Sequence, residues 1–201
     1  MRRLLQARLA EIESDLPADV DTADELLDLA ATLHVYLGDA ARSADLNARR
    51  WTLLKQRLGP ADQRSTGAGL ALAWALQADG RVDAFSAVLD ELDPQLPAAG
   101  LLRAEFWLAR HALLQAQQVG AEQRGQVLQQ ALALYERDAP LDSGHLATLR
   151  ALGQWQLGQG RAPAALANFD EALALQPRAR PYIASDHARL LVGRAEALRR
   201  L

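Results

Sequence analysis

The sequence repeats at intervals of about 40 residues, and this period limits the folds that the chain can adopt. Four glycines that mark expected turns between helices recur at a nearly constant spacing, namely Gly38, Gly80, Gly120 and Gly160. Glycine suits such a turn because it readily takes the left-handed backbone conformation that closes a helix. A repeat of this length that holds two helices is typical of a solenoid, in which each repeat stacks on its neighbours.

The residues between these turns favour helices. Apolar side chains recur at intervals of three and four, as they do on one face of a helix, and Ala, Leu, Arg, Gln and Glu dominate while β-branched residues are scarce. We therefore expect an all-α fold, a solenoid of antiparallel helix pairs with about nine helices. The expected ranges are 2–15, then 22–37 with 40–58, 62–78 with 81–92, 99–118 with 122–137, 144–158 with 162–175, and finally 184–200.

Single residues mark the ends of these helices. Prolines at four similar positions follow the second helix of each pair and stop it; they are Pro60, Pro97, Pro140 and Pro177. Side chains that can accept a hydrogen bond from the first turn of a helix stand at the start of three of the expected helices. These expected N-caps are Asp21, Ser143 and Ser185.

Composition and charge exclude several classes of protein. The chain has no cysteine, which removes disulfides, thiolate metal sites and cysteine nucleophiles. Its net charge of −3 provides no overall basic field for nucleic acid, and its longest uncharged stretch, 65–78, is shorter than the ~20 residues that span a bilayer. We expect no nucleic-acid partner, no membrane insertion and a cytoplasmic location, or a periplasmic one within a larger membrane-anchored protein.

No arrangement of residues is typical of catalysis or of a cofactor site. The carboxylates are scattered, the nucleophile motif G-x-S-x-G is absent, and the glycines near 153–160 do not follow a strand. No two histidines lie three or four positions apart, so no single helix presents a metal-binding pair; they are His34, His111, His145 and His187. We expect no catalytic residue, no cofactor, no metal and no enzymatic activity.

The segment 146–177 closely resembles a tetratricopeptide repeat (TPR). Eight positions match the spaced signature of that family, namely Leu149, Leu152, Gly153, Gly160, Ala165, Phe169, Ala172 and Pro177. The segment 37–60 resembles the longer second helix of the kinesin-light-chain-like subtype, whose units have about 40 residues. The other units keep the turn and the period but few of the small residues, so the resemblance covers about 20–201.

The resemblance implies an organisation and a function. It divides the chain into an N-terminal helix at 1–19 (a cap or the remnant of a preceding repeat), four TPR-like pairs at 20–180 and a capping helix at 181–201, together one repeat domain. The resemblance also implies that the pairs stack into a right-handed superhelix, a TPR-like α-solenoid. In the TPR family the first helices line its concave groove, which binds peptides or proteins. Such arrays are common in bacterial multidomain regulators, which suggests a regulatory part of a larger bacterial signalling protein.

Aligning the turn glycines assigns candidate residues to that groove. Arg110 and Arg150 lie one period apart at the same repeat position, which in the family points into the groove and holds a ligand carboxylate. Trp74 and Trp107 fall on first-helix positions that face the groove in related repeats. We expect a non-catalytic module that binds a peptide or protein through six residues, Trp74, Trp107, Arg110, Gln117, Arg150 and Gln154.

The terminal helices support an alternative function. A repeat unit without a neighbour leaves an apolar face exposed, and the first and last expected helices each lack a partner. A module for self-association, with a homodimer as its product, is therefore the alternative.

Overall fold

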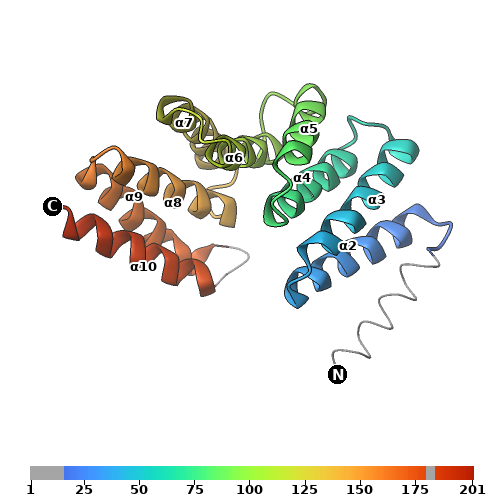
Figure 1. Cartoon of the computed structure of the whole chain (residues 1–201), viewed down its shortest axis with the longest axis horizontal. Coiled ribbons are helices and arrows are strands. Elements are labelled where there is room, and N and C mark those ends of the chain that lie inside the picture. The colour runs from blue at the N-terminus through green and yellow to red at the C-terminus, as the bar shows by residue number, and fades with distance from the viewer. Residues whose placement is uncertain (1–15, 180–183) are drawn as a thin grey trace. The chain divides into compact units, whose positions relative to one another are not determined.

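A computed structural model of the chain describes residues 16–179 and 184–201, and these residues form nine α-helices without a strand (Figure 1). The expected all-α fold of helix pairs is confirmed. The helix expected over 2–15 lies outside the described residues. The helices are α2 (Val20–Leu37), α3 (Ala40–Leu58), α4 (Gln63–Ala78), α5 (Val82–Leu92), α6 (Leu101–Ala116), α7 (Ala121–Asp138), α8 (Ser143–Gly158), α9 (Ala162–Leu175) and α10 (Ala184–Arg199).

The chain divides into two compact units, Met1–Leu96 and Pro97–Leu201. In the first unit α2 packs against α3, α3 against α4, and α4 against α5. In the second unit α6 pairs with α7 and α8 with α9, while α8 also contacts α6, α7 and α10. None of the described helices is long and apolar enough to cross a membrane.

The turns agree with the glycine pattern at three of the four positions. Gly38, Gly80 and Gly160 have φ values of 78°, 75° and 71°, the left-handed conformation that favours glycine. Gly120 differs, because its φ is −49° and it precedes the first residue of α7. The left-handed residue of that turn is Gln118, with φ 56°.

Two of the expected N-caps were wrong by one or two positions. Asp19, rather than Asp21, caps α2, and its carboxylate accepts the Thr22 N–H at 2.8 Å. Asp142, rather than Ser143, caps α8 by accepting the Gly144 N–H at 2.7 Å. In both cases two residues that can act as an N-cap lie close together in the sequence. The helix begins after the one whose carboxylate reaches the free N–H groups of the first turn. The expected cap Ser185 was wrong as well, because α10 already begins at Ala184 and Ser185 lies within it.

An ionic cluster joins three helices of the first unit. The buried carboxylate of Asp24 on α2 accepts hydrogen bonds from Arg50 on α3 and from Arg64 on α4, the latter at 2.8 Å. Arg50 also binds Asp28, and Arg64 also binds Asp21, each at 2.6 Å. The Asp24 carboxylate therefore fixes α2 to its two successors in the chain.

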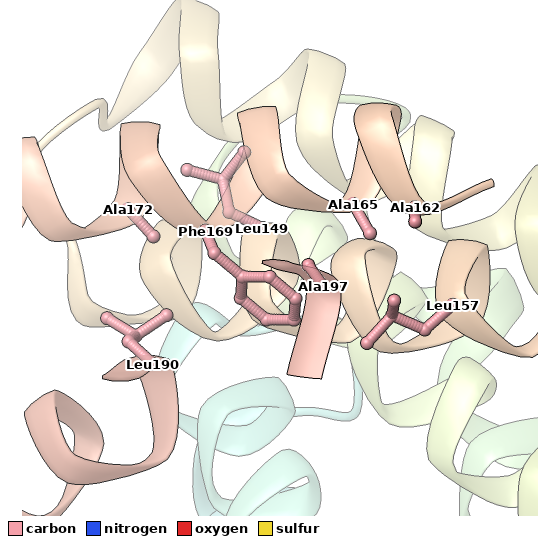
Figure 2. Packing of buried hydrophobic residues seen from close by; sticks show 8 residues of the cluster. All are labelled: Leu149, Leu157, Ala162, Ala165, Phe169, Ala172, Leu190 and Ala197. Atoms are coloured by element: carbon pink, nitrogen blue, oxygen red, sulfur yellow. The ribbon is translucent and has the colours of Figure 1, made fainter. Parts of the chain in front are cut away.

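One aromatic ring fills the core cluster between α8, α9 and α10 in the second unit. Phe169 on α9 is fully buried, and Figure 2 shows its ring among Leu149, Leu190 and Ala197. Two glycines allow α8 and α10 to approach this ring. A Cβ atom would lie 2.7 Å from the ring at Gly153 and 2.4 Å from it at Gly193, closer than packed atoms allow.

Candidate functional site

The six predicted binding residues are distributed over both units. Trp74 lies on α4 in the first unit, where it is partly buried. The second unit contains the other five, of which Trp107 and Arg110 lie on α6 and Gln117 caps its C-terminal end. Arg150 and Gln154 lie one helical turn apart on α8, a helix that contacts α6. These arginine-bearing first helices of the second unit define the candidate site.

Arg150 is the best-defined member of this site. Its side chain is partly buried, and among the described residues the only polar contact of its guanidinium is Gln154 Oε1, at a distance of 3.5 Å. Burial lowers the pKa of Arg150, Asp186 of α10 opposes this shift, and Arg189 of α10 adds to it. The guanidinium nevertheless remains protonated, as arginine does in proteins. Arg150 thus presents a cation whose hydrogen-bonding capacity is largely unused.

His111 is a neighbour of Arg150 that was not predicted from the sequence. This buried histidine on α6 places its Nδ1 at 3.4 Å from the carbonyl oxygen of Arg124. Burial lowers the pKa of His111, and the charges of Arg124 and Arg150 lower it further against the opposing effect of that hydrogen bond. The imidazole is therefore neutral at pH 7 and leaves the positive charge of this region to arginine. The sequence signal for this contact was that His111 directly follows Arg110, the residue at the same repeat position as Arg150.

Trp107 lies at the edge of a small core. Its ring is partly buried, meets Phe106 edge to face at 5.2 Å between centroids, and packs against the cluster of Ala104, Ala131 and Tyr135. Trp107 therefore connects α6 with α7 and retains some exposed surface. Its role as an anchor for a ligand stays a prediction.

Two other tryptophans hold helices together. Trp155 donates its indole N–H to the carbonyl oxygen of Ala121 at 2.7 Å and lies against Gly125, where a Cβ would come within 2.4 Å of the ring. Trp51 packs against Gly69 in the same manner, and the Lys55 ammonium lies 3.6 Å from its ring centroid. Both rings are parts of the helix packing.

Comparison with known proteins establishes the fold. No family model and no curated protein matches the sequence. Two crystal structures of Podosopora anserina putative kinesin light chain, with nearly identical TPR-like repeats, do match; one of them carries a point substitution. They have TM-scores of 0.66 and 0.65 and identities of 14% and 16%, and each match covers 87% of this chain and 84% of the other.

This likeness shows that the chain has the TPR-like repeat fold, the class that its sequence resembles. TPR-like repeats generally mediate protein–protein interaction, through the extended surfaces that stacked repeats create. They are typically scaffolds without catalytic activity.

Proposed function

We propose that the chain is a non-catalytic TPR-like module that binds a peptide or protein segment over α6 and α8 of the second unit. The observation that carries this proposal is the partly buried guanidinium of Arg150, whose one polar contact among the described residues is long. A guanidinium in this state has donors in a planar fork that match a carboxylate. A carboxylate of the bound segment, from a side chain or the C-terminus, is the expected partner.

Four more of the predicted residues lie in the second unit and extend this surface. Arg110 occupies the same repeat position as Arg150 one unit earlier, and Gln154 lies beside Arg150 on α8. The exposed part of Trp107 offers apolar contact, and Gln117 lies at the C-terminal end of α6. Trp74 lies on α4 of the first unit, and its part in binding is a separate prediction. Because TPR-like arrays are common in bacterial multidomain regulators, we further propose that the module is a regulatory part of a larger signalling protein.

Replacing Arg150 by glutamine is expected to weaken peptide binding about 10- to 100-fold, because a charged hydrogen-bonded pair contributes about 1.5–3 kcal/mol. Peptides with free C-terminal carboxylates would be selected from a displayed library on the whole wild-type chain. Their affinities would then be measured by fluorescence anisotropy for Arg150→Gln. Arg137→Gln is the matched control, since Arg137 is an exposed arginine of the same unit that pairs with Asp138. Equal affinities for wild type and Arg150→Gln would contradict the proposed site.

A second function, self-association, is favoured by where apolar side chains are exposed. Seven of the nine large exposed hydrophobic residues among those described lie on α2 or at the C-terminal helix and its end. Contiguous exposed apolar surface is typical of interaction sites, and each of these two regions offers at least three such residues. The seven are Leu29, Val35, Tyr36, Leu191, Val192, Leu198 and Leu201.

If these surfaces form a homodimer, Val192→Asp should abolish it. Val192 is 71% exposed, so the change leaves the fold intact but places a charge in an apolar interface, which is costly without a partner. Light scattering over a concentration series would show a dimer for the wild type and a monomer for the variant. Leu101→Asp, at an exposed position on α6, is the control and should behave as the wild type. A wild-type chain that stays monomeric at all concentrations would remove this function.

A further inference from the structure

Three potential metal ligands converge in the second unit. They come from successive helices, with Glu136 near the end of α7, His145 in the first turn of α8 and Glu171 near the end of α9. One ligand atom from each side chain lies within 4.8 Å of the other two. The two carboxylates are exposed, whereas the imidazole is only 2% exposed. The group therefore has a fixed buried member and two members that can move.

The hydrogen bonding of His145 leaves one nitrogen free. Its Nδ1 lies 2.8 Å from the carbonyl oxygen of Pro140, which can only accept, so Nδ1 carries the proton and donates it. Nε2 then retains its lone pair. It is buried and has no hydrogen-bond partner among the described residues. An unsatisfied buried acceptor costs free energy, and a cation near Nε2 would remove that cost.

The surroundings of the ring hold it in place. The phenol ring of Tyr135 stacks on the imidazole with 6.3 Å between centroids and 15° between planes. Tyr135 itself is held against Gly144, where a Cβ would come within 2.2 Å of its hydroxyl oxygen. A histidine that donates Nδ1–H to a backbone carbonyl and is packed on one face has the orientation found in histidines that bind metals through Nε2.

We propose that Glu136, His145 and Glu171 bind a divalent transition-metal ion, with Zn²⁺ as the representative ion. One imidazole nitrogen and two carboxylate oxygens suit such an ion, and ligand bonds of about 2.0–2.2 Å place neighbouring ligands about 3–3.6 Å apart. The present separations of up to 4.8 Å are larger, and rotation of the exposed glutamates closes them. Water occupies the remaining coordination position.

The charges of the group favour a cation as well. Two carboxylates that approach this closely repel each other, and a divalent ion between them converts the repulsion into attraction. Because the ligands come from α7, α8 and α9, the ion would join three successive helices. A ligand that binds only the folded chain stabilises it in proportion to the logarithm of its concentration over its dissociation constant.

The sequence predicted no metal site, because no two histidines lie three or four positions apart on one helix. The three ligands are separated by 9 and 26 positions, and only the pairing of α7 with α8 and of α8 with α9 brings them together.

Isothermal titration of the full chain with Zn²⁺ alone tests the proposal. We expect one ion per wild-type chain and a higher midpoint of thermal unfolding in its presence. The double variant Glu136→Gln/Glu171→Gln should weaken binding by at least the ~10–100-fold that follows loss of an outer ligand contact. Its midpoint without Zn²⁺ should equal that of the wild type, because both side chains are exposed. Glu122→Gln, at an exposed position of α7, is the matched control and should bind as the wild type does.

Nitrogen NMR of the imidazoles supplies a second readout that does not depend on a His145 variant. Zn²⁺ should shift the His145 Nε2 resonance and leave Nδ1 protonated. Absence of Zn²⁺ binding to the wild type, unchanged binding to the double variant, or a response at another histidine in place of His145 would overturn the proposal.

Discussion

Replacing Phe169 by alanine is expected to lower the free energy of unfolding by about 3–5 kcal/mol. The ring is fully buried where α8, α9 and α10 meet, and its removal leaves a cavity that the neighbouring helices cannot fill. Gly153 and Gly193 lie against the ring and have no side chain with which to occupy the space. The loss therefore includes both the transfer of the ring from water and the cost of the cavity.

Chemical denaturation would measure this loss, and hydrogen exchange would locate it. The largest increase in exchange is expected in α8, α9 and α10, because stacked repeats interact mainly with their neighbours. Leu191→Ala is the control, since Leu191 lies on α10 but is exposed and should change stability by about 0.5 kcal/mol or less. A loss for Phe169→Ala as small as that of the control would show that the ring does not organise the second unit.

This core was predictable because its members recur in sequence. The resemblance of 146–177 to a TPR already placed Gly153 and Phe169 at matching positions, and Gly193 follows Gly153 by one period of the repeat. Both glycines contact the same ring, so one repeated position explains how successive helices approach it. The local sequence was enough to predict these core positions because each helix pair repeats the same packing.

The candidate sites depend on contacts that the period does not encode. The pattern predicted a shared position for Arg110 and Arg150 but not the neutral His111 or the neighbouring charges Asp186 and Arg189. Asp142 and Ser143 are adjacent and both can cap a helix, so only the hydrogen bond from the Gly144 N–H to Asp142 identifies the cap of α8. Individual side chains on helix faces are set by packing between helices, and a repeat signature records only the positions common to all units.

The ionic cluster on Asp24 was not predicted from the sequence either. Its partners Arg50 and Arg64 follow Asp24 by 26 and 40 positions, so they meet only when α2, α3 and α4 pack together. Asp24→Asn should therefore lower the free energy of unfolding at pH 7 by about 2–3 kcal/mol, because it leaves two arginines without their shared buried carboxylate. Asp21 and Asp28 remain as partners and limit the loss.

The pH dependence of stability distinguishes this charge effect from a change in packing. Burial raises the pKa of Asp24, but the hydrogen bonds and charges of Arg50 and Arg64 outweigh it, so the pKa lies below the ordinary value of 3.8. A carboxyl group whose pKa is lower in the folded chain stabilises the fold above its unfolded pKa. That contribution disappears as the pH falls from about 3.8 through the folded value.

Wild type and Asp24→Asn should consequently differ most at neutral pH and converge in acid. Urea denaturation at a series of pH values would measure both curves. Asp28→Asn is the matched control, because Asp28 contacts only Arg50 in this cluster and its side chain is 54% exposed against 9% for Asp24, so little stability should be lost. A difference between wild type and Asp24→Asn that stays constant from pH 7 to acid would mean that Asp24 acts through its shape, and that its charge does not hold α2 to α3 and α4.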